Sequence, residues 1–266
     1  MVHILSTLLL LLLSLGQASA SEVMFEGYYR IDLEAKHIGY SVLRYEFDPK
    51  AKTFQVTSFV RAKMGNDIIQ ESFKGKTTDR FEPVSYQYTA IVGKENKMID
   101  ASFKGQIMTL SISDGKKVRK ETHKIPKGTF FSSFLPYMML QKKLELNQAF
   151  KYEALAEEEG NVYTGKSMVE SKEKRGPYET FKILNSYKGE EFISEMAVIK
   201  DPKNPDKNIR GEVFSTNSPA KKISTQLVNS PSVATKGQIV PNKVMVSLFG
   251  GMPTGKLNLV ATPPEK

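Results

Sequence analysis

The chain contains no cysteine and only three histidines among its 266 residues. The absence of cysteine excludes disulfides, thiol catalysis, thiolate metal sites and lipidation of an N-terminal cysteine. Outside the first twenty residues, His37 and His123 each stand alone, and no HxxxH or HExxH pair occurs. An isolated histidine is more often structural than catalytic. We therefore expect no metal site and no cofactor.

Sequence motifs of the common enzyme classes are also absent. The chain has no GxSxG motif, Gly-rich phosphate loop, EF-hand loop or dinucleotide-binding fingerprint. The carboxylates at residues 157–159 directly precede a Gly-Asn turn. This pattern is typical of a solvated hairpin tip rather than a cation site. We predict that the protein is not an enzyme, and we assign no catalytic residue.

A short, almost wholly apolar run occurs at residues 4–15, followed by Ala18, Ser19 and Ala20. The run is shorter than the roughly 20 residues of a spanning helix. Small residues at this spacing predict a cleaved signal peptide over residues 1–20, so that Ser21 begins the mature chain. An uncleaved membrane anchor is the alternative. No Asn-x-Ser/Thr site occurs, so nothing indicates a glycosylated secretory protein. We therefore expect residues 21–266 to lie in a bacterial periplasm, with the cell surface as the alternative.

Net charge is +9, and lysine supplies most of the 38 basic residues. Lysines scattered near turns keep a protein soluble and guard strand edges against pairing. They would also attract an anionic membrane surface or an acidic envelope protein, which are the partners we expect besides a lipid. We expect no nucleic-acid partner, because the sequence contains no binding motif for one.

Apolar and polar residues alternate along most of the chain. Phe25, Tyr29 and Ile31 fall on one side of residues 23–33, and Arg30 and Asp32 on the other, which is typical of a half-buried strand. Short turn signals separate the strands and favour antiparallel neighbours. Residues 109–121 predict a hairpin with its turn at Asp114 and Gly115. Further strands are expected at 37–47, 53–61, 67–75, 84–93, 149–156, 161–171, 178–187, 191–200, 211–217, 221–228 and 255–261.

This pattern predicts a mostly β fold. We expect a long antiparallel meander that forms a strongly curved sheet or an incomplete barrel. Residues 21–266 should form a single domain, because no long linker interrupts them. Within it, Pro, Gly and Ser are frequent in residues 229–255, which predicts an irregular segment, and residues 201–208 predict a polar loop.

The stretch KGTFFSSFLPYMMLQKK, residues 127–143, departs from the alternation. Apolar residues at steps of three and four predict a short helical insert at about 130–142. Such a face commonly packs as core. Alternatively, it covers the concave side of the sheet and lines a cavity for an apolar ligand. The candidate ligand-binding residues are Phe130, Phe131, Phe134, Leu135, Tyr137, Met138 and Met139, with Lys142 and Lys143 for an anionic head group.

Four stretches, at residues 128–140, 176–183, 211–224 and 255–260, resemble a family of uncharacterised periplasmic bacterial proteins. Members of this family contain a domain of unknown function with a half-barrel similar to the lipoprotein-carrier (Lol-type) fold. The resemblance implies an incomplete barrel and a role with an apolar ligand. It implies no catalytic residue.

Three functions remain open from the sequence. The first is an exported, non-enzymatic envelope protein that binds a lipid or acyl chain in a curved sheet. The second is an envelope structural or assembly factor with a filled core, which acts through its basic surface or a free strand edge. The third is an outer-membrane β-barrel. The third fits less well, because Arg30 and Asp32 lie on a face that would meet lipid.

Overall fold

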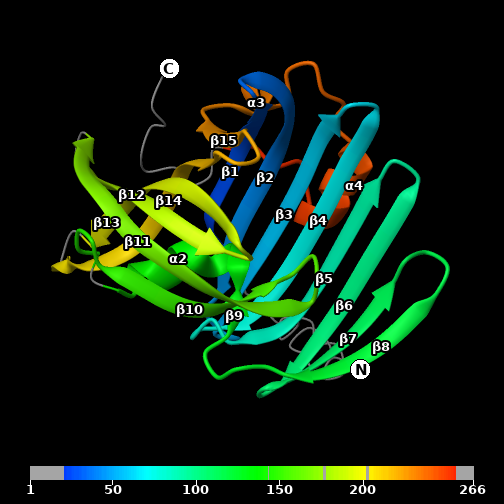
Figure 1. Ribbon diagram of the computed structural model, residues 1–266, viewed down its shortest axis with the longest axis horizontal. Helices are drawn as coiled ribbons and strands as arrows, with labels where there is room; N and C mark the ends of the chain where they lie inside the picture. The colour runs from blue at the N-terminus through cyan, green and yellow to red at the C-terminus, as the bar shows by residue number, and fades with distance from the viewer. Residues whose placement is uncertain (1–20, 143, 176–177, 202–203, 256–266) are drawn as a thin grey trace, which may run out of the picture.

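The computed structural model describes residues 21–255 except 143, 176–177 and 202–203 (Figure 1). The predicted signal peptide, residues 256–261 of the predicted last strand and Lys143 lie outside these residues. The described strands form one sheet, in the order β8-β7-β6-β5-β4-β3-β2-β1-β15-β14-β13-β12-β11-β10-β9. Two lobes of strands, β1–β8 and β9–β15, are therefore joined side by side through β1 and β15.

The first lobe is a meander in which each strand pairs antiparallel with the next, as predicted. Tight turns connect most of these strands, and Gly65, Gly93 and Gly105 take positive φ there. The strands are β1 (Glu22–Leu33), β2 (Lys36–Asp48), β3 (Thr53–Met64), β4 (Asp67–Thr78), β5 (Pro83–Val92), β6 (Glu95–Lys104), β7 (Ile107–Ser113) and β8 (Val118–Lys124).

The second lobe is a shorter meander that returns to the start of the chain. Its last strand pairs antiparallel with β1, and Leu227 lies opposite Tyr29. The prediction of a loop at 201–208 is wrong for residues 201 and 204–208. Asp201 ends β13, and pairing with β13 extends β14 back to Asn204 with irregular register. The strands are β10 (Ala149–Ala156), β11 (Asn161–Arg175), β12 (Tyr178–Tyr187), β13 (Glu190–Asp201), β14 (Asn204–Ser218) and β15 (Ile223–Val228).

The helical insert lies between the two lobes, as predicted. It contains a 3-10 turn, η1 (Ser132–Phe134), and a helix, α2 (Leu135–Leu140), with a proline in its first turn. The first residues of the predicted insert instead form strand β9 (Phe130–Phe131), which pairs parallel with β10. This pair departs from the antiparallel meander, because the insert itself provides the long crossover that a parallel pair requires.

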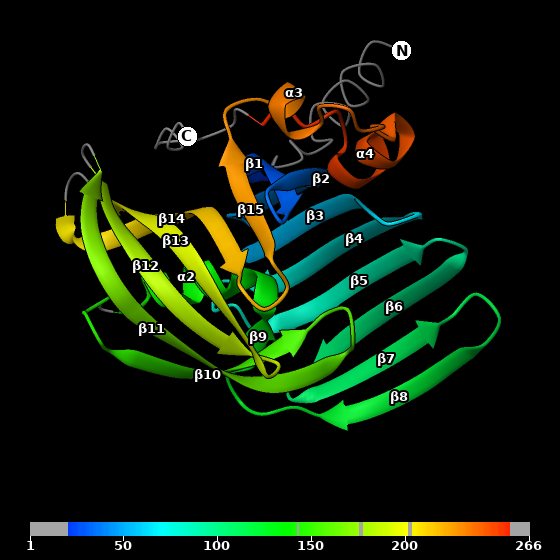
Figure 2. The ribbon, with the colours of Figure 1, turned by 45° about the horizontal axis from the view of Figure 1, so that its top comes forward.

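The sheet is strongly curved and open, with β8 and β9 as its two edges. Figures 1 and 2 both place α2 on the inner side, between the two lobes. Side chains of both lobes and of the insert form the main core there, including Tyr29, Tyr86, Phe131, Phe134 and Leu155. The predicted fold class, a mostly β protein with a strongly curved sheet and a short helical insert, is confirmed.

Two helices, α3 (Pro231–Ala234) and α4 (Asn242–Phe249), cover the outer face of β1–β3 (Figure 2). Met245 and Phe249 pack there on Tyr28 and Phe59. The prediction of an irregular segment at 229–255 is therefore wrong for these residues, whose helical form depends on tertiary packing rather than on a clear periodic pattern. For the same reason β1 is buried on both faces at residues 25–29. No helix among the described residues is long and apolar enough to cross a membrane.

Candidate functional site

A pocket of about 310 Å³ lies between the insert and strands β10 and β11. We call it the insert pocket. The insert contributes Phe130, Leu135, Met138 and Met139 to its wall, and Phe150, Tyr152 and Ser167 face them from β10 and β11. This lining is largely apolar, and the volume is at the lower end of the roughly 300–1,000 Å³ typical of small-molecule pockets.

Backbone pairing on both sides of β10 fixes one wall of the pocket. The parallel pair β9–β10 places Phe130 opposite Ala154, and the rings of Phe130 and Tyr152 lie 5.7 Å apart between centroids. On the other side of β10, Tyr152 pairs with Gly165. A Cβ atom at residue 165 would lie 2.2 Å from the Tyr152 ring. The ring therefore lies over β11 only because residue 165 has no side chain.

Three lysines, Lys127, Lys142 and Lys151, stand at the exposed rim of the pocket. None of them forms an ion pair within the part of the chain that the structure describes. The rim also contains Glu153, whose carboxylate accepts a hydrogen bond from Thr164 Oγ1 at 2.8 Å. The rim therefore carries an excess of positive charge, which attracts anions. Lys143, the second predicted head-group residue, lies outside the described residues.

The predicted apolar candidates divide into two groups. Phe130, Leu135, Met138 and Met139 line the insert pocket, whereas Phe131, Phe134 and Tyr137 do not.

These other three side chains fill the main core and have little exposed surface. The ring of Phe131 lies 5.6 Å from that of Tyr86, and the ring of Phe134 lies 5.4 Å from that of Tyr45. The insert thus buries one face in the core and presents the other to a cavity.

A buried carboxylate holds the insert against the second lobe. Ser132 Oγ donates to Glu157 Oε2 at 2.5 Å, and the Ser133 backbone N–H donates to Glu157 Oε1 at 3.1 Å. Burial raises the pKa of the Glu157 carboxyl, although these hydrogen bonds oppose the shift. The hairpin tip predicted at residues 157–159 exists, but the expectation that it is solvated is wrong for Glu157, because the insert covers that side chain.

The charged groups near Glu157 do not line the insert pocket, and one of them, Lys97, connects the two lobes. Lys97 Nζ of β6 donates to the Glu158 carbonyl oxygen at 2.7 Å, and the Lys188 ammonium pairs with the Glu158 and Glu159 carboxylates. Burial and the neighbouring Glu158 charge raise the pKa of Glu71. No group of three or more His, Cys, Asp or Glu in the described residues could hold a metal ion.

The pocket wall therefore provides apolar surface and a cationic rim. Glu153 is the titratable acid in its lining, which includes no histidine and no second carboxylate. The geometry suits the binding of an amphiphile with an anionic end.

Several pocket residues escaped the sequence analysis, among them Lys127, Phe150, Lys151 and Tyr152. Alternation in residues 149–156 does place Phe150 and Tyr152 on one face of a strand. However, no sequence signal indicates that this strand pairs with β9. That pairing alone brings the face against the insert.

Comparison with known proteins gives a likeness of fold. No protein family matches the chain, and no curated protein matches it. Among solved structures, it is similar to a β-barrel-like protein of the domain of unknown function DUF1849 from Brucella abortus, with a TM-score of 0.52 and 10% sequence identity. The match covers 77% of this chain and 97% of the other. At this identity the similarity shows the fold alone: a β-barrel-like domain of unknown function.

Proposed function

We propose that this protein is a non-enzymatic envelope protein that holds the acyl chain of an anionic lipid in the insert pocket. The observation that carries the proposal is the combination of an apolar wall with a rim of three lysines that have no ion-pair partner in the described residues. The half-barrel resemblance to lipoprotein carriers agrees with this role.

The energetics favour a single chain in this pocket. Each buried methylene contributes about 0.8 kcal/mol, so that burial of several carbons of an acyl chain offsets part of the free-energy cost of association without any specific polar contact. The side chains of Met138 and Met139 are unbranched and adapt to chains of different shape. A carboxylate or phosphate at the mouth would contact Lys127, Lys142 and Lys151.

Ligand binding is tested by native mass spectrometry of gently purified protein and by titration with a fluorescent fatty acid. We expect co-purified lipid and saturable probe binding. Met138→Trp fills the pocket and should weaken probe binding at least tenfold. Met252→Trp, at a position 45% exposed and outside the pocket, is the matched control. Absence of both lipid and probe binding in the wild-type protein would contradict the proposal.

The head-group contact has a separate test. Lys127→Glu combined with Lys142→Glu should weaken binding of an anionic probe more at low salt than at high salt. Exposed charges act over a Debye length of about 8 Å at physiological ionic strength, and added salt shortens it. If the double variant binds with wild-type affinity at every salt concentration, then the lysines do not contact the head group and only the apolar wall binds.

Export to the periplasm is part of the proposal and rests on the sequence of residues 1–20. Intact mass of the exported protein should correspond to a chain that begins at Ser21. A protein isolated from the envelope with Met1 retained would favour the membrane-anchor alternative.

A second candidate function, a structural or assembly factor, is favoured by the filled core. Phe131, Phe134 and Tyr137 are buried in the main core, and strand β8 has a free edge within the described sheet. A partner strand could pair with that edge. Cross-linking from β8 to an envelope protein, in a chain that binds no acyl probe, would support this candidate over the first.

A further inference from the structure

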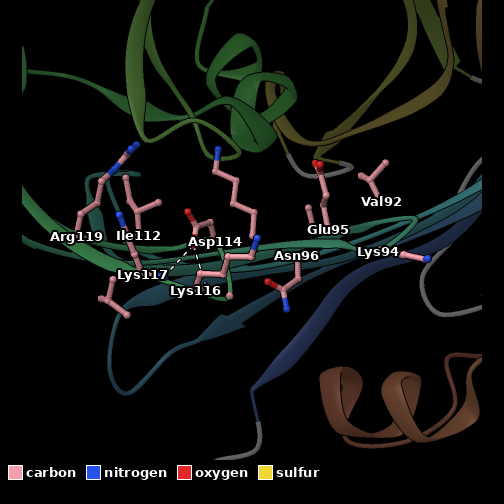
Figure 3. Close-up of a pocket in the computed structure, with 13 residues that line it drawn as sticks. Val92, Lys94, Glu95, Asn96, Ile112, Asp114, Lys116, Lys117 and Arg119 are labelled. Atoms are coloured by element: carbon pink, nitrogen blue, oxygen red, sulfur yellow. Dashed lines mark hydrogen bonds between the residues drawn. The ribbon is translucent and has the colours of Figure 1, made fainter.

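Four turns of the first lobe lie at the same end of the sheet, because successive strands run antiparallel. They connect β1 to β2, β3 to β4, β5 to β6, and β7 to β8. A groove of about 930 Å³ opens between the last two turns (Figure 3). We call it the turn-end groove. Ala90, Val92, Ile112 and Val118 provide its apolar surface.

Five cationic side chains line this groove: Lys94, Lys97, Lys116, Lys117 and Arg119. Lys97 donates to a carbonyl oxygen and Arg119 pairs with Glu121, which lies outside the groove lining. The other three have no ion-pair partner within the described residues.

The acidic residues of the groove do not balance this charge. The Asp114 carboxylate accepts the backbone N–H groups of Lys116 and Lys117, both at 2.9 Å, and so belongs to the turn. Glu95 is the other acid in the lining. The groove therefore has an excess of positive charge at its open end.

A close contact fixes the position of these lysines. Gly115 has a φ of +83°, and a Cβ atom there would lie 2.2 Å from Asn96 Oδ1. The β7–β8 turn is thus packed directly against β6. Figure 3 shows Glu95, Ile112 and Arg119 on one side of the sheet, and Asn96 pointing to the other. The two lysine-bearing turns are consequently held together rather than splayed.

Large apolar side chains are exposed around the same end of the sheet. Clustered exposure of this kind marks interaction surfaces, whereas single exposed apolar residues are normal. Ile91 and Val92 are neighbours in β5 and therefore project from opposite faces of the sheet. The exposed apolar residues at this end are Met64, Ile68, Ile91, Val92, Met98 and Val118, each between 39% and 66% exposed.

We propose that the turn end of the first lobe docks on an anionic lipid surface. Lys94, Lys116 and Lys117 would contact the head groups, and the apolar side chains would enter the interfacial region between them. Lysine clusters are attracted to anionic leaflets. The exposed apolar groups lie on both faces of one end of the sheet. A fluid lipid interface can surround both faces, whereas a rigid protein surface would contact only one of them. This proposal does not depend on a ligand in the insert pocket.

The first test is sedimentation of the full mature chain with phosphatidylcholine vesicles, with or without about one-third phosphatidylglycerol. We expect binding to the anionic vesicles, weakened by salt. Each lysine near an anionic surface contributes about fivefold to partitioning, so loss of three charges costs about 100-fold, and Lys94→Glu, Lys116→Glu and Lys117→Glu together should reduce partitioning by more than this because each charge is reversed. Lys104→Glu, Lys166→Glu and Lys236→Glu change the net charge equally at exposed sites elsewhere and are the control.

A second pair of variants tests the apolar part. Ile91→Ser with Val118→Ser should weaken vesicle binding several-fold while leaving its salt dependence unchanged. Ile107→Ser with Val233→Ser removes side chains of comparable exposure elsewhere and should have little effect. Denaturation midpoints of all variants verify that they are folded.

Several results would overturn the proposal. One is equal binding to neutral and anionic vesicles, and another is equal loss in the groove and control triple variants. Displacement from vesicles by millimolar pyrophosphate, with the groove variant insensitive to it, would indicate a site for soluble phosphate. Binding to polyglutamate but not to vesicles would indicate an acidic protein partner instead.

Discussion

The guanidinium of Arg44 and the carboxylate of Glu26 form a buried ion pair across β1 and β2, in which Arg44 Nε donates to Glu26 Oε2 at 2.7 Å. The second carboxylate oxygen accepts the backbone N–H groups of Thr254 and Gly255 at 2.7 and 2.9 Å. Arg44 also donates to the Phe249 carbonyl oxygen at 2.6 Å. The pair thus anchors the segment that follows α4 to the outer face of the sheet.

Removal of Glu26 should therefore be strongly destabilising. Glu26→Ala leaves the Arg44 charge buried without a partner, and we expect a loss of about 3–5 kcal/mol in the free energy of unfolding. Glu121→Ala breaks a pair with Arg119 on the exposed edge strand and should cost less than about 0.5 kcal/mol. Urea denaturation measures both. Similar losses would mean that the Glu26 pair contributes no more than a surface pair.

The two faces of the insert should respond differently to truncation. Phe134 is fully buried in the main core, so Phe134→Ala should destabilise the protein by about 3–5 kcal/mol. Met138 lines a cavity and already lacks neighbours on one side, so Met138→Ala should cost clearly less. Denaturant midpoints decide this. An equal loss of stability in the two variants would mean that Met138 is packed in the core and does not line a pocket.

Stability should depend on pH through Glu157. Burial raises the pKa of this carboxyl above its ordinary value of 4.5 in the folded state. The protonated form is then favoured by folding, so this contribution to stability is present below the ordinary pKa and is lost as the pH rises through the raised value. Thermal denaturation should show that Glu157→Gln becomes more stable relative to wild type as the pH rises to neutrality. A constant difference would contradict this.

Gly165 should control the shape of the pocket wall. An alanine there would clash with the ring of Tyr152 and force it to move, at a cost of about 1–3 kcal/mol. In a Tyr152→Ala background the same substitution should cost little, which a double-mutant cycle measures. Gly165→Ala should also change acyl-probe affinity. Additive effects of the two substitutions would show that the contact between residue 165 and Tyr152 does not determine the shape of the pocket wall.

A clash test also applies to the turn-end groove. Gly115→Ala introduces a Cβ atom against Asn96, whereas Gly105→Ala meets nothing within 4 Å. Both glycines have positive φ, so both substitutions should cost about 1–2 kcal/mol through backbone strain. Gly115→Ala should cost more, and Asn96→Ala should remove the excess. Equal unfolding free energies for the two alanine variants would contradict a close contact between the turns.

The sequence predicted the first lobe well because its turns are short and its alternation is local. A chain that reverses at Gly65 and Gly93 has few alternatives to a hairpin. The insert was also predictable, because six apolar residues at helical spacing are visible in a single window.

Long-range pairing was not predictable. Neither the parallel contact of Phe130 with the strand at Ala154 nor the pairing of Tyr29 with Leu227 leaves a signal in local composition. The same holds for α4. Its residues 244–246 are all apolar, so the sequence does not indicate which side of the helix packs on the sheet. These pairings decide which predicted residues meet in the insert pocket.

The pairing of β1 with β15 has a consequence for the order of folding. The strand nearest the N-terminus lies inside the sheet, and one of its edges is completed only by residues 223–228. While the chain emerges N-terminus first, the hairpins of the first lobe can form, but β1 keeps an unpaired edge until almost the whole chain has emerged. Such contacts between distant residues slow folding and leave an edge open to wrong partners. A chain shortened before residue 223 would therefore be prone to aggregation, even though its first lobe is intact.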